Sequence, residues 1–171
     1  GDVATLDLGE SGEFDRVVSV EMFEHARNWE ALLGRVARVM RREATLFLHV
    51  FTHRLHTYPF DARDASDWMS RYFFTGGIMP SDSFVYGFQD ELRVREHHRV
   101  DGTHYARTAE AWLHHFDARR AAIEPILRDV YGSDAKKWAE RWRIFFMACA
   151  ELWGFDRGRE WMVSHYLLER R

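Results

Sequence analysis

Two carboxylates and an imidazole follow directly on a valine-rich run near the start of the chain. The run is Phe14–Val20, and the polar residues behind it are Glu21, Glu24 and His25. Carboxylates and imidazoles are common proton carriers in catalysis, and this spacing puts all three on one face of a helical turn. Because ligands of open α/β sheets gather at the carboxyl ends of strands, the cluster predicts a reactive site there.

The same residues also have an ordinary structural interpretation. Early-turn carboxylates are stabilised by the helix dipole, and His25 could simply pack or cap. His49 lies in an apolar run, where a lone imidazole is commonly a core residue, and Tyr105 follows a turn where surface packing is common. The ten histidines suggest a metal site, but no cysteine or carboxylate joins them at zinc spacing, so no metal is predicted.

The elements around the cluster form a strand–helix–strand pattern. Val17, Val18 and Val20 are β-branched and follow Phe14 in a short run. Asn28 can cap a helix with a 3.6-residue apolar period, and residues 44–51 form a second apolar run. This order predicts a βαβ unit with a right-handed crossover. Four arginines are expected at the solvated end of its helix: Arg35, Arg38, Arg41 and Arg42.

The rest of the chain predicts mostly helices followed by a late strand. We expect a short helix at residues 68–74, a loop at 75–80, a helix from Ser81 to about 88, and a strand at 92–100 ending in an Asp101-Gly102 turn. A long helix capped by Thr108 should kink or break near Pro125. A helix ending at Gly154 and a strand at 161–168 complete the pattern.

Composition limits the classes of protein. The chain has 171 residues, 46% of them hydrophobic, and a net charge of −3, which favours one folded domain and no nucleic-acid partner. The single cysteine, Cys149, is expected in a helix core and suits a reducing compartment. No apolar run is long enough to span a membrane. We therefore expect a cytoplasmic protein, with peripheral lipid contact left open and the oligomeric state undetermined.

The segment from Phe14 to His25 resembles a strand motif of the S-adenosylmethionine-dependent methyltransferases grouped with cyclopropane fatty acid synthase and coclaurine N-methyltransferase. The resemblance continues in order through Tyr72-Phe-Phe-Thr-Gly-Gly, Phe88-Gln-Asp-Glu, His104-Tyr-Ala-Arg-Thr-Ala-Glu-Ala-Trp112, Glu151-Leu-Trp-Gly and Glu160-Trp-Met-Val-Ser-His165. It implies an α/β fold, namely the C-terminal part of a Rossmann-like class I methyltransferase sheet with an inserted helical cap.

The resemblance also implies that a part of the fold is missing. None of the eleven glycines forms a G-x-G pair, so the first strands and the glycine-rich cofactor loop are expected to be absent. Residues 1–171 would then be one partial domain: a strand–helix–strand core at 1–53, a cap and late core elements at about 54–131, and a last helix and strand at 132–171. Such a fragment alone should be inactive, and the strand at 14–20 should lie at an open sheet edge.

The family implies roles for particular residues. S-adenosylmethionine would meet Asp2 and Val3 at its adenine, and Val20 and Glu21 near the strand end. In the amine branch, Glu24 and His25 lie nearest the acceptor, with Glu21 in support. In the lipid branch, Glu24, His49 and Tyr105 would hold a bicarbonate.

Within this resemblance, the residues of the motif favour the amine branch, because lipid-branch relatives usually have a small residue where this chain has Glu21. The acceptor would be a small amine or an amphipathic molecule. Lipid methylation or cyclopropanation with bound bicarbonate remains the second interpretation. A third, from another class, is a non-catalytic interaction module.

Overall fold

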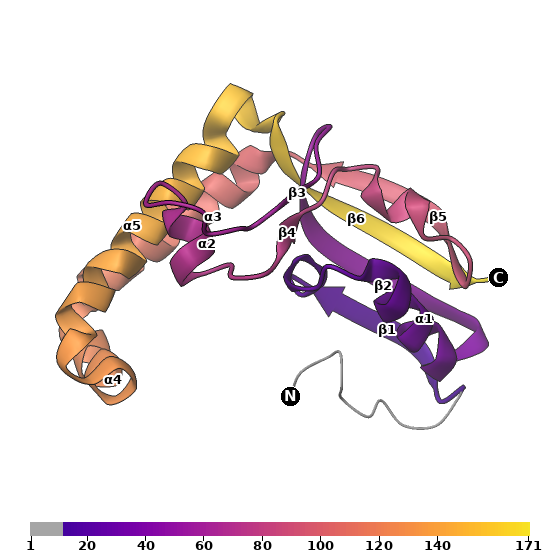
Figure 1. Cartoon of the computed structure of the whole chain (residues 1–171), viewed down its shortest axis with the longest axis horizontal. Helices are drawn as coiled ribbons and strands as arrows, with labels where there is room; N and C mark the ends of the chain where they lie inside the picture. Colours follow the sequence, from indigo (N-terminus) through magenta and orange to yellow (C-terminus); the bar gives the residue numbers. More distant parts are fainter. Residues whose placement is uncertain (1–11) are drawn as a thin grey trace. The chain divides into compact units, whose positions relative to one another are not determined.

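The computed structural model describes residues 12–171. The chain divides into two compact units: one runs up to Val100 and resumes at Val163–Arg171, and the other is Asp101–Met162. The first contains a four-stranded sheet, and the second is a helical insertion between the last two strands of the chain (Figure 1). The predicted α/β class with an inserted helical cap is therefore confirmed.

The sheet has the strand order β1-β2-β6-β5. Its strands are β1 (Phe14–Val20), β2 (Met40–His53), β5 (Leu92–Val100) and β6 (Trp161–Arg170). β1 runs parallel to β2, with Val20 opposite His49, and β5 runs antiparallel to β6. The parallel pair carries its carboxyl ends to one edge, where ligands of such sheets gather.

β1 is an edge strand of the described sheet, as predicted. Its only partner among residues 12–171 is β2, and Val18 and Val20 are 66% and 55% exposed. A hollow of about 660 Å³ runs beside it, lined largely by apolar side chains including Val17, Val36 and Leu46. An exposed apolar edge of this kind favours association with another strand.

α1 (Trp29–Val39) follows β1 through the short 3₁₀ turn η1 (Phe23–His25). The side chain of Asn28 accepts a hydrogen bond from the Ala31 backbone N–H at 2.9 Å, which confirms the predicted cap. The apolar face of the helix joins one core with the strands, comprising Trp29, Leu32, Leu33, Val36, Leu46, Leu48, Val50 and Tyr166. This core fixes the turn that carries Glu24.

The predicted end of this helix was wrong by several residues. α1 ends at Val39 and β2 begins at Met40, so Arg41 and Arg42 belong to a strand. The reason is pairing: Phe14 lies opposite Met40 across a register shift, and Arg41 Nη1 binds the Asp15 carboxylate at 2.9 Å. Strand pairing overrode a helical pattern that the local sequence supported.

The segment between β2 and β5 contains short elements only. They are β3 (Tyr58–Pro59), α2 (Trp68–Tyr72), β4 (Ile78–Met79) and the 3₁₀ turn η2 (Phe84–Gly87). β3 and β4 pair antiparallel. The helix predicted near residues 68–74 is present in shortened form, whereas the helix predicted from Ser81 is wrong, because only η2 forms there.

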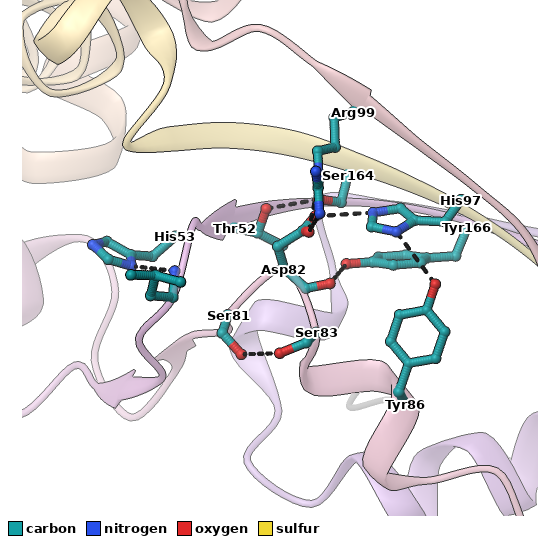
Figure 2. Close-up of polar contacts among 11 residues, drawn as sticks. Thr52, His53, Ser81, Asp82, Ser83, Tyr86, His97, Arg99, Ser164 and Tyr166 are labelled. Carbon is teal, nitrogen blue, oxygen red and sulfur yellow. Dashed lines mark hydrogen bonds and ion pairs between the residues drawn. The ribbon is translucent and has the colours of Figure 1, made fainter.

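Buried polar contacts explain why no regular helix forms after Ser81 (Figure 2). The Asp82 carboxylate accepts hydrogen bonds from Ser164 Oγ at 2.7 Å and Arg99 Nε at 2.8 Å, and its Oδ1 lies 2.9 Å from His97 Nε2. The Tyr166 hydroxyl donates to the Asp82 carbonyl at 2.7 Å. The segment after Ser81 therefore forms hydrogen bonds with β5 and β6 instead of the backbone hydrogen bonds of a regular helix.

The second unit consists of α3 (Gly102–Ala118), α4 (Arg120–Tyr131), the turn η3 (Gly132–Asp134), α5 (Ala135–Gly154) and the turn η4 (Phe155–Gly158). Thr108 is not the cap of α3, because the Asp101 carboxylate accepts from the Thr103 N–H at 2.8 Å. The expected break lies at Arg119, and Pro125 is inside α4. Cys149 is buried on α5, as predicted.

Gly102 is required by close packing inside this unit. A Cβ atom there would lie 2.1 Å from the Trp161 carbonyl oxygen and 2.6 Å from that of Trp153. Only glycine lets the start of α3 approach these backbones. None of the helices among residues 12–171 is both long and apolar enough to cross a membrane.

Candidate active site

Glu21 stands at the carboxyl end of β1 in an unusual backbone conformation. Its φ is +49°, in the left-handed region, and its N–H donates to the His49 carbonyl oxygen at 3.1 Å. A non-glycine residue in this region carries strain, and such residues cluster at functional sites. The conformation turns the chain out of the sheet and into η1, which brings Glu24 back toward Glu21.

Glu24 is a buried carboxyl. It is 1% exposed, and its Oε2 atom has no hydrogen-bond partner among the described residues. Burial, and then the nearby charge of Glu21, raise the pKa of Glu24 from an ordinary 4.5 to about 8. The carboxyl therefore carries a proton at neutral pH, and the pair of glutamates holds one negative charge in place of two.

Neighbouring segments hold Glu24 in this position. The Trp29 indole Nε1 donates to the Phe23 carbonyl at 3.0 Å, which fixes η1 on the core. On the other side, Gly77 lies so close that a Cβ atom would be 2.5 Å from the Glu24 carbonyl oxygen. The turn is therefore clamped between the start of α1 and the loop before β4.

His25 lies beside Glu24 but is half exposed. Its Nε2 atom is 3.9 Å from Glu24 Oε1, and its side chain is 52% exposed. The ring stacks on Phe74 with centroids 5.8 Å apart and an interplanar angle of 14°. Phe74 in turn contacts Phe60 and Phe51, so an aromatic cluster adjoins the imidazole.

Arg27 anchors the loop that carries this aromatic cluster. Its Nε donates to the Gly76 carbonyl at 2.8 Å, and its Nη2 donates to Asp61 at 2.7 Å. Phe60 and Phe74 were not among the predicted site residues. Phe74 lies in the Tyr72-Phe-Phe-Thr-Gly-Gly segment of the resemblance, and Phe60 lies in an irregular segment rich in aromatic residues. Neither signal reveals that Phe74 stacks on His25 or that Phe60 packs against Phe74.

His49 connects Glu21 to a second imidazole. Its Nε2 atom lies 3.0 Å from Glu21 Oε1, at ion-pair distance but without hydrogen-bond alignment, and its Nδ1 atom is hydrogen-bonded to His165 Nε2 at 2.9 Å. Burial, and then the nearby His165, lower the pKa of His49; burial and His98 lower the pKa of His165. Sequence reasoning missed His165, which lies 116 residues from His49.

The structure brings four of the predicted residues together in the first unit: Glu21, Glu24, His25 and His49. Val20 immediately precedes them at the end of β1. Tyr105 belongs to α3 in the second unit, where it packs against Trp153 and Trp112. Asp2 and Val3 lie outside the described residues.

Residues 12–171 contain no group of three or more metal-ligating side chains placed to hold an ion. His53, one of the ten histidines, forms hydrogen bonds within its own turn. His53 is 4% exposed, and its Nδ1 accepts hydrogen bonds from the Leu55 and His56 backbone N–H groups. It shapes the turn after β2.

The chemistry of the donor set fits a cationic ligand. Two carboxyl groups lie at the end of a parallel strand pair, and one of them is buried with an oxygen that has no partner among residues 12–171; together they offer negative potential and hydrogen-bond acceptors. A sulfonium cofactor such as S-adenosylmethionine and an ammonium group both suit this environment. Of the residues predicted to bind the cofactor, Val20 ends β1 and Glu21 directly follows it.

The fold and the site define the C-terminal part of a class I methyltransferase. A crystal structure of coclaurine N-methyltransferase bound to N-methylheliamine and SAH has a TM-score of 0.87 and 34% sequence identity to this chain, and the match covers 99% of this chain and 51% of that one. The model of the mycolic acid cyclopropane synthetase family matches residues 4–160. The chain belongs to this family.

Curated relatives agree with this assignment. (S)-coclaurine N-methyltransferase of Thalictrum flavum subsp. glaucum is 36% identical over 163 residues, covering 92% of this chain and 45% of the relative. Cyclopropane-fatty-acyl-phospholipid synthase of Escherichia coli strain K12 is 28% identical over 160 residues, covering 86% and 39%. The chain thus spans about half the length of the curated relatives it matches.

Proposed function

We propose that this chain supplies the acceptor side of an S-adenosylmethionine-dependent methyltransferase that acts on a small amine. The observation that carries the proposal is the Glu21–Glu24 pair, in which a buried carboxyl with a pKa of about 8 lies beside a second carboxyl. The relatives with amine acceptors in their names, including the one at 36% identity, support the same direction.

The pKa of Glu24 suits a base for an ammonium group. An alkylammonium loses its proton near pH 10, so transfer to a carboxylate of ordinary pKa is uphill by about 8 kcal/mol, at about 1.4 kcal/mol per tenfold in proton affinity. A carboxylate whose pKa is about 8 reduces this cost to about 3 kcal/mol. The amine lone pair freed in this way is the nucleophile.

The cofactor, when bound, supplies an electrophilic methyl group on a sulfonium. The residues of this chain hold the acceptor and its proton: Glu21 attracts the ammonium, and Glu24 accepts the proton in its ionised form, which is about a tenth of the molecules at pH 7 when the pKa is about 8. His25 lies 3.9 Å from Glu24 as an exit for this proton. The aromatic cluster of Phe51, Phe60 and Phe74 offers an apolar wall for the body of the acceptor. Holding the nitrogen in line is worth about 7–11 kcal/mol of the barrier.

The alternative is lipid methylation or cyclopropanation with bound bicarbonate. The family model and the Escherichia coli relative keep this alternative open. Against it, His49 Nε2 already faces the Glu21 carboxylate at 3.0 Å, so an anion at that nitrogen would meet a negative charge. Two carboxyl groups favour a cation at this position. In the third interpretation the chain would only complete another polypeptide, without catalysis.

A hybrid enzyme tests the proposal. The N-terminal part of the Thalictrum relative would be fused ahead of this chain, and methyl transfer from a labelled donor measured with heliamine and with unsaturated phospholipid vesicles. Transfer to the amine alone supports the proposal, transfer to the lipid alone supports the alternative, and transfer to neither, with the cofactor bound, supports the non-catalytic interpretation.

Glu24→Gln then tests the base. The amide keeps the size of the side chain but cannot take a proton, so we expect a fall in kcat/KM of about 10²–10⁴-fold, the usual contribution of a general base. Glu30→Gln, an exposed carboxylate in the first turn of α1, is the matched control and should leave turnover unchanged. Turnover of Glu24→Gln at the parent rate would remove Glu24 from the mechanism.

A further inference from the structure

His165 forms the far end of a chain of three polar side chains that begins at the proposed acceptor site. Its Nε2 atom is 2.9 Å from His49 Nδ1, and His49 Nε2 is 3.0 Å from Glu21 Oε1. The three residues come from β6, β2 and the end of β1, which are neighbours in the sheet. Within residues 12–171, His165 reaches Glu21 through His49, so any role it has at the acceptor site must act through His49.

The tautomers of the two imidazoles follow from the charge of Glu21. The two atoms are not aligned for a hydrogen bond, but an unprotonated Nε2 would place its lone pair 3.0 Å from the Glu21 carboxylate oxygen, so the charge of Glu21 favours the tautomer with the proton on Nε2. A neutral imidazole has one N–H group, which leaves His49 Nδ1 as an acceptor. The hydrogen bond of 2.9 Å then requires His165 Nε2 to be the donor.

This donor opposes a second proton on His49. A proton on Nδ1 would face the N–H of His165, and each imidazole lies in a partly buried position that disfavours its charged form. Among residues 12–171, the charged and titratable groups around the His49–His165 pair are Glu21, Glu24 next to Glu21, and His98. His98 lies opposite His165 on β5. An imidazolium at His49 would neutralise Glu21.

We propose that His165 is a positioning residue that keeps His49 neutral and in its Nε2–H form, so that the negative charge of Glu21 is reserved for a cationic acceptor. This inference rests on the proposed amine transfer for its purpose, but the state of the imidazole pair can be measured without turnover. Without His165, His49 would gain a proton as the pH falls and would repel the ammonium group.

The first experiment records the ring nitrogens of His49 by NMR in the 171-residue chain labelled with ¹⁵N, between about pH 6 and about pH 8, the range in which histidines titrate. In the wild type, His49 should remain neutral with its proton on Nε2. In His165→Gln the amide oxygen can accept a hydrogen bond from a protonated Nδ1, so His49 should become an imidazolium toward the acid end. A proton on Nδ1 in the wild type would overturn the inference.

His115→Gln is the matched control, since His115 is an exposed histidine on α3 in the second unit. It should leave the ring nitrogens of His49 as in the wild type. Unchanged ionisation of His49 in His165→Gln would also overturn the inference. If His165→Gln does not fold, the tautomer of His49 in the wild type still tests the inference.

The second experiment uses the hybrid enzyme and the amine acceptor. His165→Gln should raise KM by about tenfold near pH 6 and little near pH 8, because a charge within 4–6 Å contributes on that scale. His115→Gln should show no such pH-dependent change. If the NMR result is as expected but the KM of His165→Gln is unchanged near pH 6, His165 has no role in acceptor binding. A wild-type hybrid that transfers no methyl to amines would overturn the proposed function, while the NMR result would still judge the imidazole pair.

Discussion

Replacing Glu24 by glutamine should stabilise the fold at alkaline pH and leave it almost unchanged at acid pH. Glu24 is 1% exposed, and burial together with Glu21 raises its pKa to about 8. In the unfolded chain the same carboxyl ionises near pH 4.5. Between these two values the folded state must bind a proton that the unfolded state has released, so stability falls as pH rises through this window.

The size of the effect follows from the two pKa values. Tenfold in proton affinity is worth about 1.4 kcal/mol, so the step from 4.5 to about 8 corresponds to about 5 kcal/mol once the pH exceeds the folded value. A neutral glutamine of the same shape avoids this cost. We therefore expect Glu24→Gln to raise the free energy of unfolding by about 3–5 kcal/mol near pH 9 and by less than about 1 kcal/mol near pH 5.

Urea denaturation at the two pH values measures the difference. The NMR signal of the Trp29 indole N–H, on a residue that is 1% exposed in the core beside η1, reports unfolding of this unit. Glu30→Gln on the exposed face of α1 is the control and should show no pH-dependent gain. A gain for Glu24→Gln that is equal at both pH values, or absent near pH 9, would refute the assignment of a raised pKa to a buried Glu24.

Three further substitutions probe the contacts that position the site. Asp82→Asn should cost about 1.5–3 kcal/mol near neutral pH, because hydrogen bonds to a charged group are lost. Burial raises the pKa of Asp82, but hydrogen bonds from Arg99 and Ser164 and the nearby charges outweigh it and lower the pKa. The wild type should thus lose stability below about pH 4, and the variant should lose less in urea denaturation at acid pH. Gly77→Ala should cost about 1–3 kcal/mol in the same assay, since its Cβ would lie 2.5 Å from the Glu24 carbonyl. Asn28→Ala should lower the urea midpoint by the equivalent of about 1 kcal/mol, with Asn28→Asp retaining the cap.

Local patterns in the sequence predicted the elements that carry the site. The valine-rich run at 14–20, the Asn28 cap and the apolar face of α1 are signals within one element, and the structure confirms them. The position of Glu21 and Glu24 at a strand end follows from these signals alone. The sequence therefore predicted the site to the extent that its residues lie on one βαβ unit.

Contacts between distant segments could not be predicted in this way. The meeting of His49 with His165 depends on the placement of β6 beside β2, and the stacking of His25 on Phe74 depends on a loop with no regular period. The helix that we wrongly predicted from Ser81 has the same cause. Asp82 is bonded to Arg99 and Ser164, and this tertiary network outweighed the local preference for a helix.

The contact of His49 with Glu21 bears on both enzyme interpretations, because both depend on the charge of the residue that faces His49 Nε2. With a carboxylate 3.0 Å away, His49 Nε2 is directed at an anion already supplied by the chain, and a second anion there would be repelled. A small residue in place of Glu21 would leave the same nitrogen available for a bicarbonate, with Glu24 still buried beside it. The choice between a cationic acceptor and a bound anion therefore turns on residue 21. The φ of +49° at residue 21 belongs to the backbone that turns the chain out of the sheet, so the strained strand end does not itself set the charge, which comes from the side chain.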